Sequence, residues 1–125
     1  MTKSLEDYLE EIHVLIRDKG QARVRDVALA LHVKMPSVVK AIGELKKLGL
    51  ATQEPYGNIE LTEEGARAAA QVLGRHTQIK AFLVKLGVSE ANAEKDACLM
   101  EHVVSAETME RMQEFLDNKK NGKKK

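Results

Sequence analysis

The stretch VRDVALALHVKMPSVVKAIGELKKLG, residues 24–49, contains two apolar-periodic segments separated by residues 32–35. The first has the spacing of a helix of about two turns, with the apolar residues Val24, Val27, Ala28 and Leu31. Pro36 suits the first turn of a second helix, where no backbone N–H is needed, and Gly49 suits its C-terminal end because glycine adopts positive φ at low cost. The apolar side of this second helix consists of Val38, Val39, Ile42, Leu45 and Leu48. The stretch therefore predicts two helices joined by a tight turn.

A hairpin is predicted directly after these helices. Residues 50–53 and 59–61 flank the turn-forming sequence Pro55-Tyr56-Gly57-Asn58. Two helices followed by a hairpin form the order of a winged helix-turn-helix, whose second helix enters the DNA major groove while the wing reaches the flanking backbone. The same elements are also compatible with a small α+β module that has no nucleic-acid role, because a fold alone does not define a function.

Basic and polar side chains of this module favour DNA binding. Three of them are expected at the start and on the exposed side of the second helix, where base edges would be read: Lys34, Ser37 and Lys40. Four more are placed for phosphate contacts: Arg23, Arg25, Lys46 and Lys47. Any single lysine is equally consistent with a solvated surface charge, so the support comes from the cluster as a whole.

Helical periodicity continues on both sides of the module. Residues 4–18 predict an amphipathic helix with Ser4 as its N-cap, ended by Gly20. Thr62 is expected to cap a long helix that continues to Gly87 and links two domains. The sequence therefore predicts a mainly α protein in which a winged helix-turn-helix domain, residues 1–64, is joined to a helical domain.

The helical domain is expected to span residues 65–118, with Ser89 and Ser105 as N-caps of its last two helices. A set of three such helices buries too little apolar surface to be stable alone, which favours a homodimer. The lysine-rich residues 119–125 are expected to form a basic disordered tail.

Charge is unevenly distributed along the chain. The formal net charge is +1, but five of the 20 basic residues lie within residues 119–125. Residues 20–60 carry six basic against four acidic residues, a sum of +2, whereas residues 61–118 carry six against ten, a sum of −4. A mildly basic segment suits a polyanionic partner, while the acidic remainder would oppose DNA unless it bound cations.

Size and composition exclude several classes of protein. A chain of 125 residues with 43% hydrophobic side chains holds one or two small cores and no large enzyme scaffold. No run of about 18 apolar residues is present to span a membrane, and the N-terminal MTKSLEDYLEE is too acidic for a signal peptide, so a cytoplasmic protein is expected. Cys98 is the single cysteine, which excludes an internal disulfide.

The chemistry is concentrated in Cys98-Leu99-Met100-Glu101-His102. On a helix, positions i, i+3 and i+4 project from one face, which would bring a thiolate, a carboxylate and an imidazole together as donors for a metal ion. Asp7 and Glu10 likewise share a face of the first helix, and His76 lies on the long helix beside Arg75. Each of these features is weak alone, because a Glu-His pair is usually a solvated helix face and a lone cysteine a small buried hydrophobe.

Three other functions compete with metal-dependent DNA binding. A redox sensor that used Cys98 alone would lack a second cysteine for a resolving bond. A small metallohydrolase would need features that are absent, namely an HExxH motif, a nucleophile elbow or a glycine-rich phosphate loop, so no enzyme and no small organic substrate are expected. A metal-independent winged-helix regulator is the strongest alternative, with the charged faces merely solvated.

Over residues 4 to 118, the chain resembles the family of iron- and manganese-dependent repressors that includes the diphtheria toxin repressor and the manganese transport regulator. The matching stretches are Ser4-Leu5-Glu6-Asp7-Tyr8-Leu9-Glu10, Ala22-Arg23-Val24-Arg25-Asp26-Val27-Ala28, Pro36-Ser37-Val38, Leu61-Thr62-Glu63-Glu64-Gly65, Arg75-His76 and Cys98 to His102 with Ser105. The resemblance implies a homodimer in which a divalent metal joins the first helix to the dimerisation domain and sets the spacing of the two recognition helices. The metal-bound dimer would then repress metal-uptake genes. It adds Pro36 to the residues expected to contact bases, and it implies a short, two-domain form without an SH3-like domain.

The resemblance also implies the ligands of the metal site. The primary ligands would be Asp7, Cys98, Glu101 and His102, with Glu10 and His76 completing a second or shared site. The iron-sensing branch has methionine at the position of Asp7, and the manganese branch has carboxylates at both the Asp7 and Cys98 positions, so this chain is a hybrid. The Cys98 thiolate favours Fe(II), with Mn(II) as the alternative and Co(II), Ni(II) or Zn(II) as substitutes in vitro. Lys80 and Glu94 replace a carboxylate and a histidine of the ancillary site in the iron branch, which puts that site in doubt.

Overall fold

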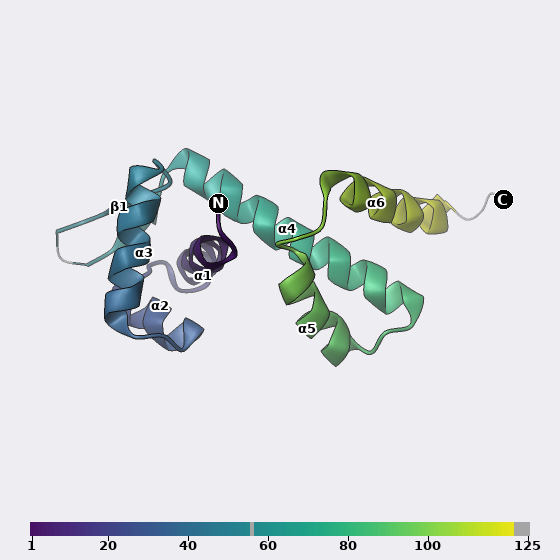
Figure 1. The fold of residues 1–125 in the computed structure, drawn as a ribbon, viewed down its shortest axis with the longest axis horizontal. Helices are drawn as coiled ribbons and strands as arrows, with labels where there is room; N and C mark the ends of the chain where they lie inside the picture. Colours follow the sequence, from purple (N-terminus) through teal and green to yellow (C-terminus); the bar gives the residue numbers. More distant parts are fainter. Residues whose placement is uncertain (56, 122–125) are drawn as a thin grey trace. The chain divides into compact units, whose positions relative to one another are not determined.

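The computed structural model of the protein describes residues 1–55 and 57–121. Within these residues the elements follow in the order α1 (Lys3–Lys19), α2 (Val24–Leu31), α3 (Met35–Lys47), β1 (Ala51–Gln53), β2 (Ile59–Leu61), α4 (Glu63–Leu86), α5 (Glu90–Met100) and α6 (Ala106–Asn121) (Figure 1). The chain divides into two compact units, with the boundary after Gln71 inside α4. The predicted class, mainly α with a small hairpin, is confirmed.

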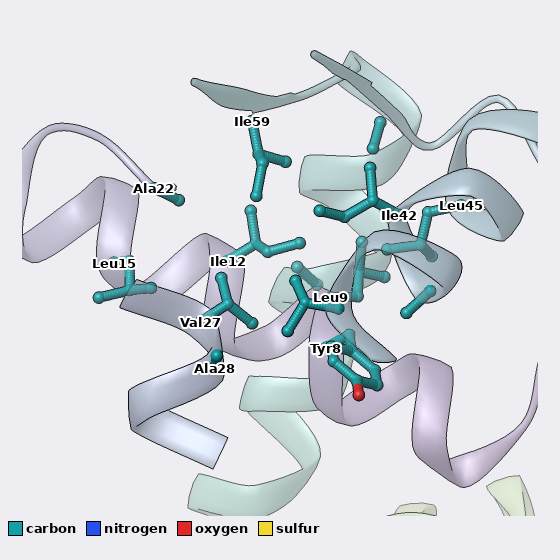
Figure 2. Packing of buried hydrophobic residues seen from close by; sticks show 14 residues of the cluster. Tyr8, Leu9, Ile12, Leu15, Ala22, Val27, Ala28, Ile42, Leu45 and Ile59 are labelled. Atoms are coloured by element: carbon teal, nitrogen blue, oxygen red, sulfur yellow. The ribbon is translucent and has the colours of Figure 1, made fainter. Parts of the chain in front are cut away.

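The N-terminal unit has a continuous hydrophobic core. Leu9 and Ile12 of α1, Leu45 of α3 and Ile59 of β2 are at most 1% exposed, and their side chains point toward one another (Figure 2). Val27 joins them from α2 at 0% exposure. Burying each aliphatic side chain of this size stabilises the fold by roughly 1.5–3 kcal/mol. The core therefore fixes the three helices and the hairpin as one module.

The first helix begins earlier than the sequence predicts. Thr2, and not Ser4, is the N-cap, because its side-chain oxygen accepts a hydrogen bond from the N–H of Leu5 at 3.1 Å. Both residue types are good caps, so the choice between them is local. The helix ends as predicted at Gly20, whose φ of 82° is left-handed.

The tight turn of the helix-turn-helix is built by backbone geometry. His32 ends α2 in a left-handed conformation with φ 58°, and Pro36 lies in the first turn of α3 as predicted. Gly49 follows α3 with φ 77°, which lets the N–H of Leu50 donate to the carbonyl of Leu45 at 2.9 Å. These bonds satisfy the last carbonyls of α3 and turn the chain into the hairpin.

The hairpin is a short antiparallel pair in which Ala51 is opposite Leu61. It is extended by the segment before α2, because the N–H of Ile59 donates to the carbonyl of Ala22 at 2.8 Å and Arg23 forms an isolated bridge with Asn58. This is the predicted wing. Tyr56 of the predicted turn lies outside the described residues.

The wing is joined to α4 by a close packing of backbone on backbone. Thr62 caps α4 as predicted, since its hydroxyl oxygen accepts from the N–H of Gly65 at 3.0 Å and donates to the carbonyl of Gly49 at 2.8 Å. A Cβ atom on Gly65 would lie 1.9 Å from the carbonyl oxygen of Leu50. Glycine is therefore required at position 65 for this close approach.

The C-terminal unit consists of the second half of α4 together with α5 and α6. Its core contains Ile79 from α4, Ala97 from α5, and Met109 and Met112 from α6, each at most 8% exposed. The rings of Phe82 and Phe115 pack edge to face with centroids 5.3 Å apart. This small core holds α5 against α4, which positions the side chains described below.

The predicted helix starts of this unit are confirmed, and one helix end differs from the prediction. Ser89 accepts from the N–H of Asn92 at 3.3 Å, and Ser105 accepts from the N–H of Thr108 at 3.1 Å. The sequence places Glu101 and His102 on the helix of Cys98, but α5 ends at Met100 and the chain continues in a turn. Helix α6 runs to Asn121, three residues into the predicted tail 119–125, and residues 122–125 lie outside the described part of the chain.

None of the helices in the described part of the chain combines the length and apolar character needed to cross a bilayer. The predicted domain boundary between residues 64 and 65 lies at the start of the same helix in which the two units meet. It stays a prediction.

Candidate metal centre and DNA-binding face

The predicted ligands come from four segments. Asp7 and Glu10 lie on α1 in the N-terminal unit, where Asp7 also pairs with Lys3 at 3.1 Å. The other four predicted ligands belong to the C-terminal unit: His76 on α4, Cys98 on α5, and Glu101 and His102 in the turn after α5.

His76 is the central residue of this unit's polar cluster. Its Nε2 atom lies 3.0 Å from Oε2 of Glu94, and its Nδ1 atom lies 2.9 Å from Oε1 of Glu101. Its side chain is only 13% exposed. One imidazole thus connects a carboxylate on α5 with a carboxylate in the turn that follows α5.

Cys98 and Glu94 lie one turn apart on α5, and the Sγ atom is 3.9 Å from Oε2 of Glu94. Ligand atoms of His76, Glu94 and Cys98 all lie within 4.8 Å of one another. A nitrogen, an oxygen and a sulfur donor at this separation suit a first-row divalent metal such as Fe(II), Co(II) or Zn(II). The residues therefore fit a metal ion.

Glu101 is a buried charged residue. Its side chain is 3% exposed, and its Oε2 atom lies 3.3 Å from Nε2 of His102, whose side chain is 1% exposed. A buried carboxylate is costly unless it is paired, and here imidazoles face both of its oxygens. Carboxylates and imidazoles are also the usual protein ligands of divalent transition metals.

Arg75 holds the turn that carries Glu101 and His102. Its Nε atom donates to the carbonyl of Glu101 at 2.8 Å, and its Nη2 atom donates to the carbonyl of Val104. These carbonyls lie at and beyond the C-terminal end of α5, where a positive charge is favourable. Arg75 therefore fixes the backbone of the turn to α4.

Glu94 was not predicted as a ligand, although it lies one turn before Cys98 on the same helix. The pKa of Glu94 is lowered by its hydrogen bonds with His76 and, to a smaller extent, Lys80. The Nζ atom of Lys80 lies 3.2 Å from Oε1 of Glu94. Two sequence signals pointed to Glu94: its i, i+4 spacing to Cys98, and the resemblance, which places it where the iron branch has an ancillary-site histidine. The packing of α4 against α5 brings it to His76.

The predicted DNA-binding residues all lie on the surface of the N-terminal unit. All eight are exposed: Arg23, Arg25, Lys34, Pro36, Ser37, Lys40, Lys46 and Lys47. The helix α3 also exposes two apolar side chains, Met35 at 49% and Val39 at 57%. Contacts of these residues with DNA stay a prediction.

Comparison with known proteins agrees with this architecture. The N-terminal DNA binding domain of the iron dependent repressors matches residues 1–59, and the metal binding and dimerisation domain of the same family matches residues 62–123. The transcriptional regulator MntR of Geobacillus kaustophilus is 39% identical over 111 residues, which cover 89% of this chain and 79% of the relative.

Two solved structures show the same fold. IdeR of T. acidophilum superimposes with a TM-score of 0.80 at 31% identity, covering 90% of this chain and 53% of that one. A manganese-dependent transcriptional repressor in complex with manganese gives a TM-score of 0.79 at 28% identity, covering 90% and 52%. The chain spans about half the length of these two solved chains.

A winged helix-turn-helix joined to a helical unit with clustered histidine, carboxylate and thiol groups, together with the two matched domains, is the architecture of a DNA-binding transcription regulator. The two matched domains account for almost the whole chain. The chain belongs to the iron dependent repressor family of metal-dependent transcriptional regulators, as the sequence resemblance predicted.

Proposed function

We propose that this protein is a homodimeric repressor of metal-uptake genes that binds its operator only when Fe(II) or Mn(II) occupies its metal centre. The convergence of His76, Glu94, Cys98 and Glu101 in a chain that also carries a winged helix supports this proposal most directly. The alternative of a metal-independent regulator would leave this donor-rich cluster, with the buried carboxylate of Glu101, without a role.

The proposed ligands are Asp7, Glu10, His76, Cys98, Glu101 and His102. A bound divalent ion would supply positive charge that neutralises clustered carboxylates. Because the family resemblance assigns ligands to both domains, simultaneous ligation by the two sets would favour one interdomain arrangement, and the recognition helices of a dimer would then present one spacing to DNA. Shifting a two-state population from 1:99 to 99:1 requires a differential affinity of roughly 5.5 kcal/mol, which multidentate ligation can supply.

We propose that Fe(II) is favoured over Mn(II). The thiolate of Cys98 and the imidazole of His76 are softer donors than carboxylates, and soft donors favour the later first-row metals. Mn(II) is the second candidate, because a similar repressor was solved in complex with manganese and because Asp7, Glu10 and Glu101 supply hard oxygen donors.

Metal dependence is tested by anaerobic fluorescence anisotropy of a labelled uptake-gene promoter at fixed salt, first with chelator and then with increasing Fe(II) or Mn(II). We expect binding only when metal is present. The double variant Cys98→Ala/Glu101→Ala should lose this response, whereas Glu110→Ala, which removes an exposed carboxylate from α6, should keep it. Equal affinity with and without metal would reject the proposal in favour of a constitutive regulator.

Metal preference is tested with the single variant Cys98→Glu in the same assay. The wild type should respond at lower Fe(II) than Mn(II) concentrations, and the exchange of thiolate for carboxylate should move the preference toward Mn(II). A wild type that responds first to Mn(II), with no change in order in the variant, would assign Mn(II) and leave Cys98 without a selective role.

A further inference from the structure

The two carboxylate oxygens of Glu94 have different partners. Oε2 faces Nε2 of His76 at 3.0 Å and Sγ of Cys98 at 3.9 Å, whereas Oε1 faces the ammonium group of Lys80 at 3.2 Å. Only Oε2 therefore shares its surroundings with two other metal-ligating atoms.

The two oxygens of Glu94 have different partners because one turn of α4 faces one turn of α5. His76 and Lys80 are four residues apart on α4, and Glu94 and Cys98 are four residues apart on α5, so each pair lies on one side of its helix. The side chain of His76 is 13% exposed, that of Lys80 33% and that of Glu94 49%. The ammonium group therefore lies on the more exposed side of the cluster, and the imidazole lies on the buried side.

We propose that Lys80 is a specificity-determining residue of the metal centre: its ammonium group occupies one oxygen of Glu94, leaves the other for a cation shared with His76 and Cys98, and keeps a second cation out of this cluster. The proposal rests on the proposed function in that the cluster must bind a divalent ion at all. It adds Glu94 as a ligand through Oε2 and gives Lys80 a role that is not ligation.

The chemistry of lysine supports this role. A protonated ammonium group has three donors and no acceptor, so Lys80 cannot ligate a metal ion. It can neutralise the carboxylate of Glu94 as a fixed positive charge and repel a second cation that approaches Oε1. A carboxylate at position 80 would instead add a third metal-donor side chain beside His76 and Glu94.

The experiment compares metal stoichiometry in the wild type and in Lys80→Glu. The purified full-length chain is dialysed against buffered Mn²⁺ or Co²⁺ over a concentration series, and bound metal per subunit is measured by elemental analysis. We expect Lys80→Glu to bind one ion per subunit more than the wild type. Lys85→Glu makes the same charge change on the exposed last turn of α4 and should keep the wild-type stoichiometry.

A second variant, Lys80→Leu, removes the charge without adding a donor atom, because leucine carries only an aliphatic side chain. We expect it to keep the wild-type stoichiometry and to bind Co²⁺ about tenfold more tightly, the effect expected from removing one like charge a few ångströms away. Glu94→Gln should change the visible absorption of bound Co²⁺, because it replaces a carboxylate ligand by a neutral amide.

The outcomes separate this proposal from the function on which it rests. A wild type that binds metal, together with a folded Lys80→Glu variant of identical stoichiometry and a Lys80→Leu variant of unchanged affinity, would overturn the role of Lys80 and leave metal-dependent regulation intact. An unchanged Co²⁺ spectrum in Glu94→Gln would overturn the assignment of Glu94. Absence of bound metal in the wild type would overturn both the proposed function and this inference.

Discussion

Replacing Gly65 by alanine tests how the wing is joined to the long helix. The Cβ atom of alanine would lie 1.9 Å from the carbonyl oxygen of Leu50, and real contacts of this kind stay above 3.0 Å, so the first turn of α4 and residue 50 must move apart. The same carbonyl accepts a hydrogen bond from the N–H of Thr62 at 3.1 Å, so the movement also strains that bond. The obstacle is backbone and cannot rotate away as a side chain would.

The change in the free energy of unfolding combines two destabilising contributions and one stabilising contribution. Forcing extra volume into a packed site costs about 1–3 kcal/mol, and weakening one buried hydrogen bond costs about 1 kcal/mol more. The higher helix propensity of alanine returns about 1 kcal/mol. We therefore expect Gly65→Ala to lower the free energy of unfolding by about 2 kcal/mol, or to lower Tm by roughly 10 °C for a unit of this size.

The assay is urea unfolding of the metal-free protein, followed by circular dichroism at 222 nm. Gly43→Ala is the matched control, because Gly43 lies inside α3 of the same unit and a Cβ atom there has no neighbour within 4 Å. It should stabilise the protein by about 0.5–1 kcal/mol through helix propensity alone. A Gly65→Ala variant as stable as Gly43→Ala would refute the close approach of α4 to residue 50.

Three further predictions concern the turn, one ion pair and the DNA-binding face. Arg75→Lys removes the fork that bonds two backbone carbonyls, so we expect about 10–100-fold weaker Mn²⁺ binding in a calorimetric titration, and unchanged affinity would contradict the anchoring role. The pKa of Asp18 lies below its ordinary value of 3.8 because Arg17 donates hydrogen bonds to it. The stabilising ion pair is therefore complete above about pH 4 and is lost as the pH falls through the lowered pKa. Arg17→Gln should return the pKa of Asp18, measured by NMR, toward its ordinary value. Lys40→Ala should change sequence preference in DNA-binding assays, whereas Arg25→Ala should weaken all duplexes alike and reduce the salt slope by about 1.

The features that the sequence predicts well are set by local backbone chemistry. Pro36, Gly49 and Thr62 each perform at their own position the role that their residue type favours, namely starting a helix, ending one and capping one. The N-terminal cap was misplaced because Thr2 and Ser4 are chemically equivalent caps two residues apart. Apolar periodicity does not distinguish between such neighbours.

The features that the sequence does not predict depend on contacts between distant segments. The end of α5 at Met100 is accompanied by hydrogen bonds from Arg75, which is 26 residues from Glu101 in the sequence, and helical spacing carries no information about such a partner. Cys98 was expected to share a face with Glu101 and His102. Its Sγ atom lies 3.9 Å from Oε2 of Glu94, one turn earlier on α5, and the meeting of this pair with His76 of α4 is set by the tertiary fold.

The exposed apolar side chains of α3 have a consequence for the operator. Met35 and Val39 stand on the same helix as the polar residues proposed to read bases, and they can offer the major groove only hydrocarbon or thioether surface. The C5-methyl group of thymine is the apolar feature that a base pair displays there. An operator recognised through these two side chains would therefore depend on thymine at the matching steps, and it would lose affinity when those thymines are replaced by uracil, although every Watson–Crick pair would be preserved.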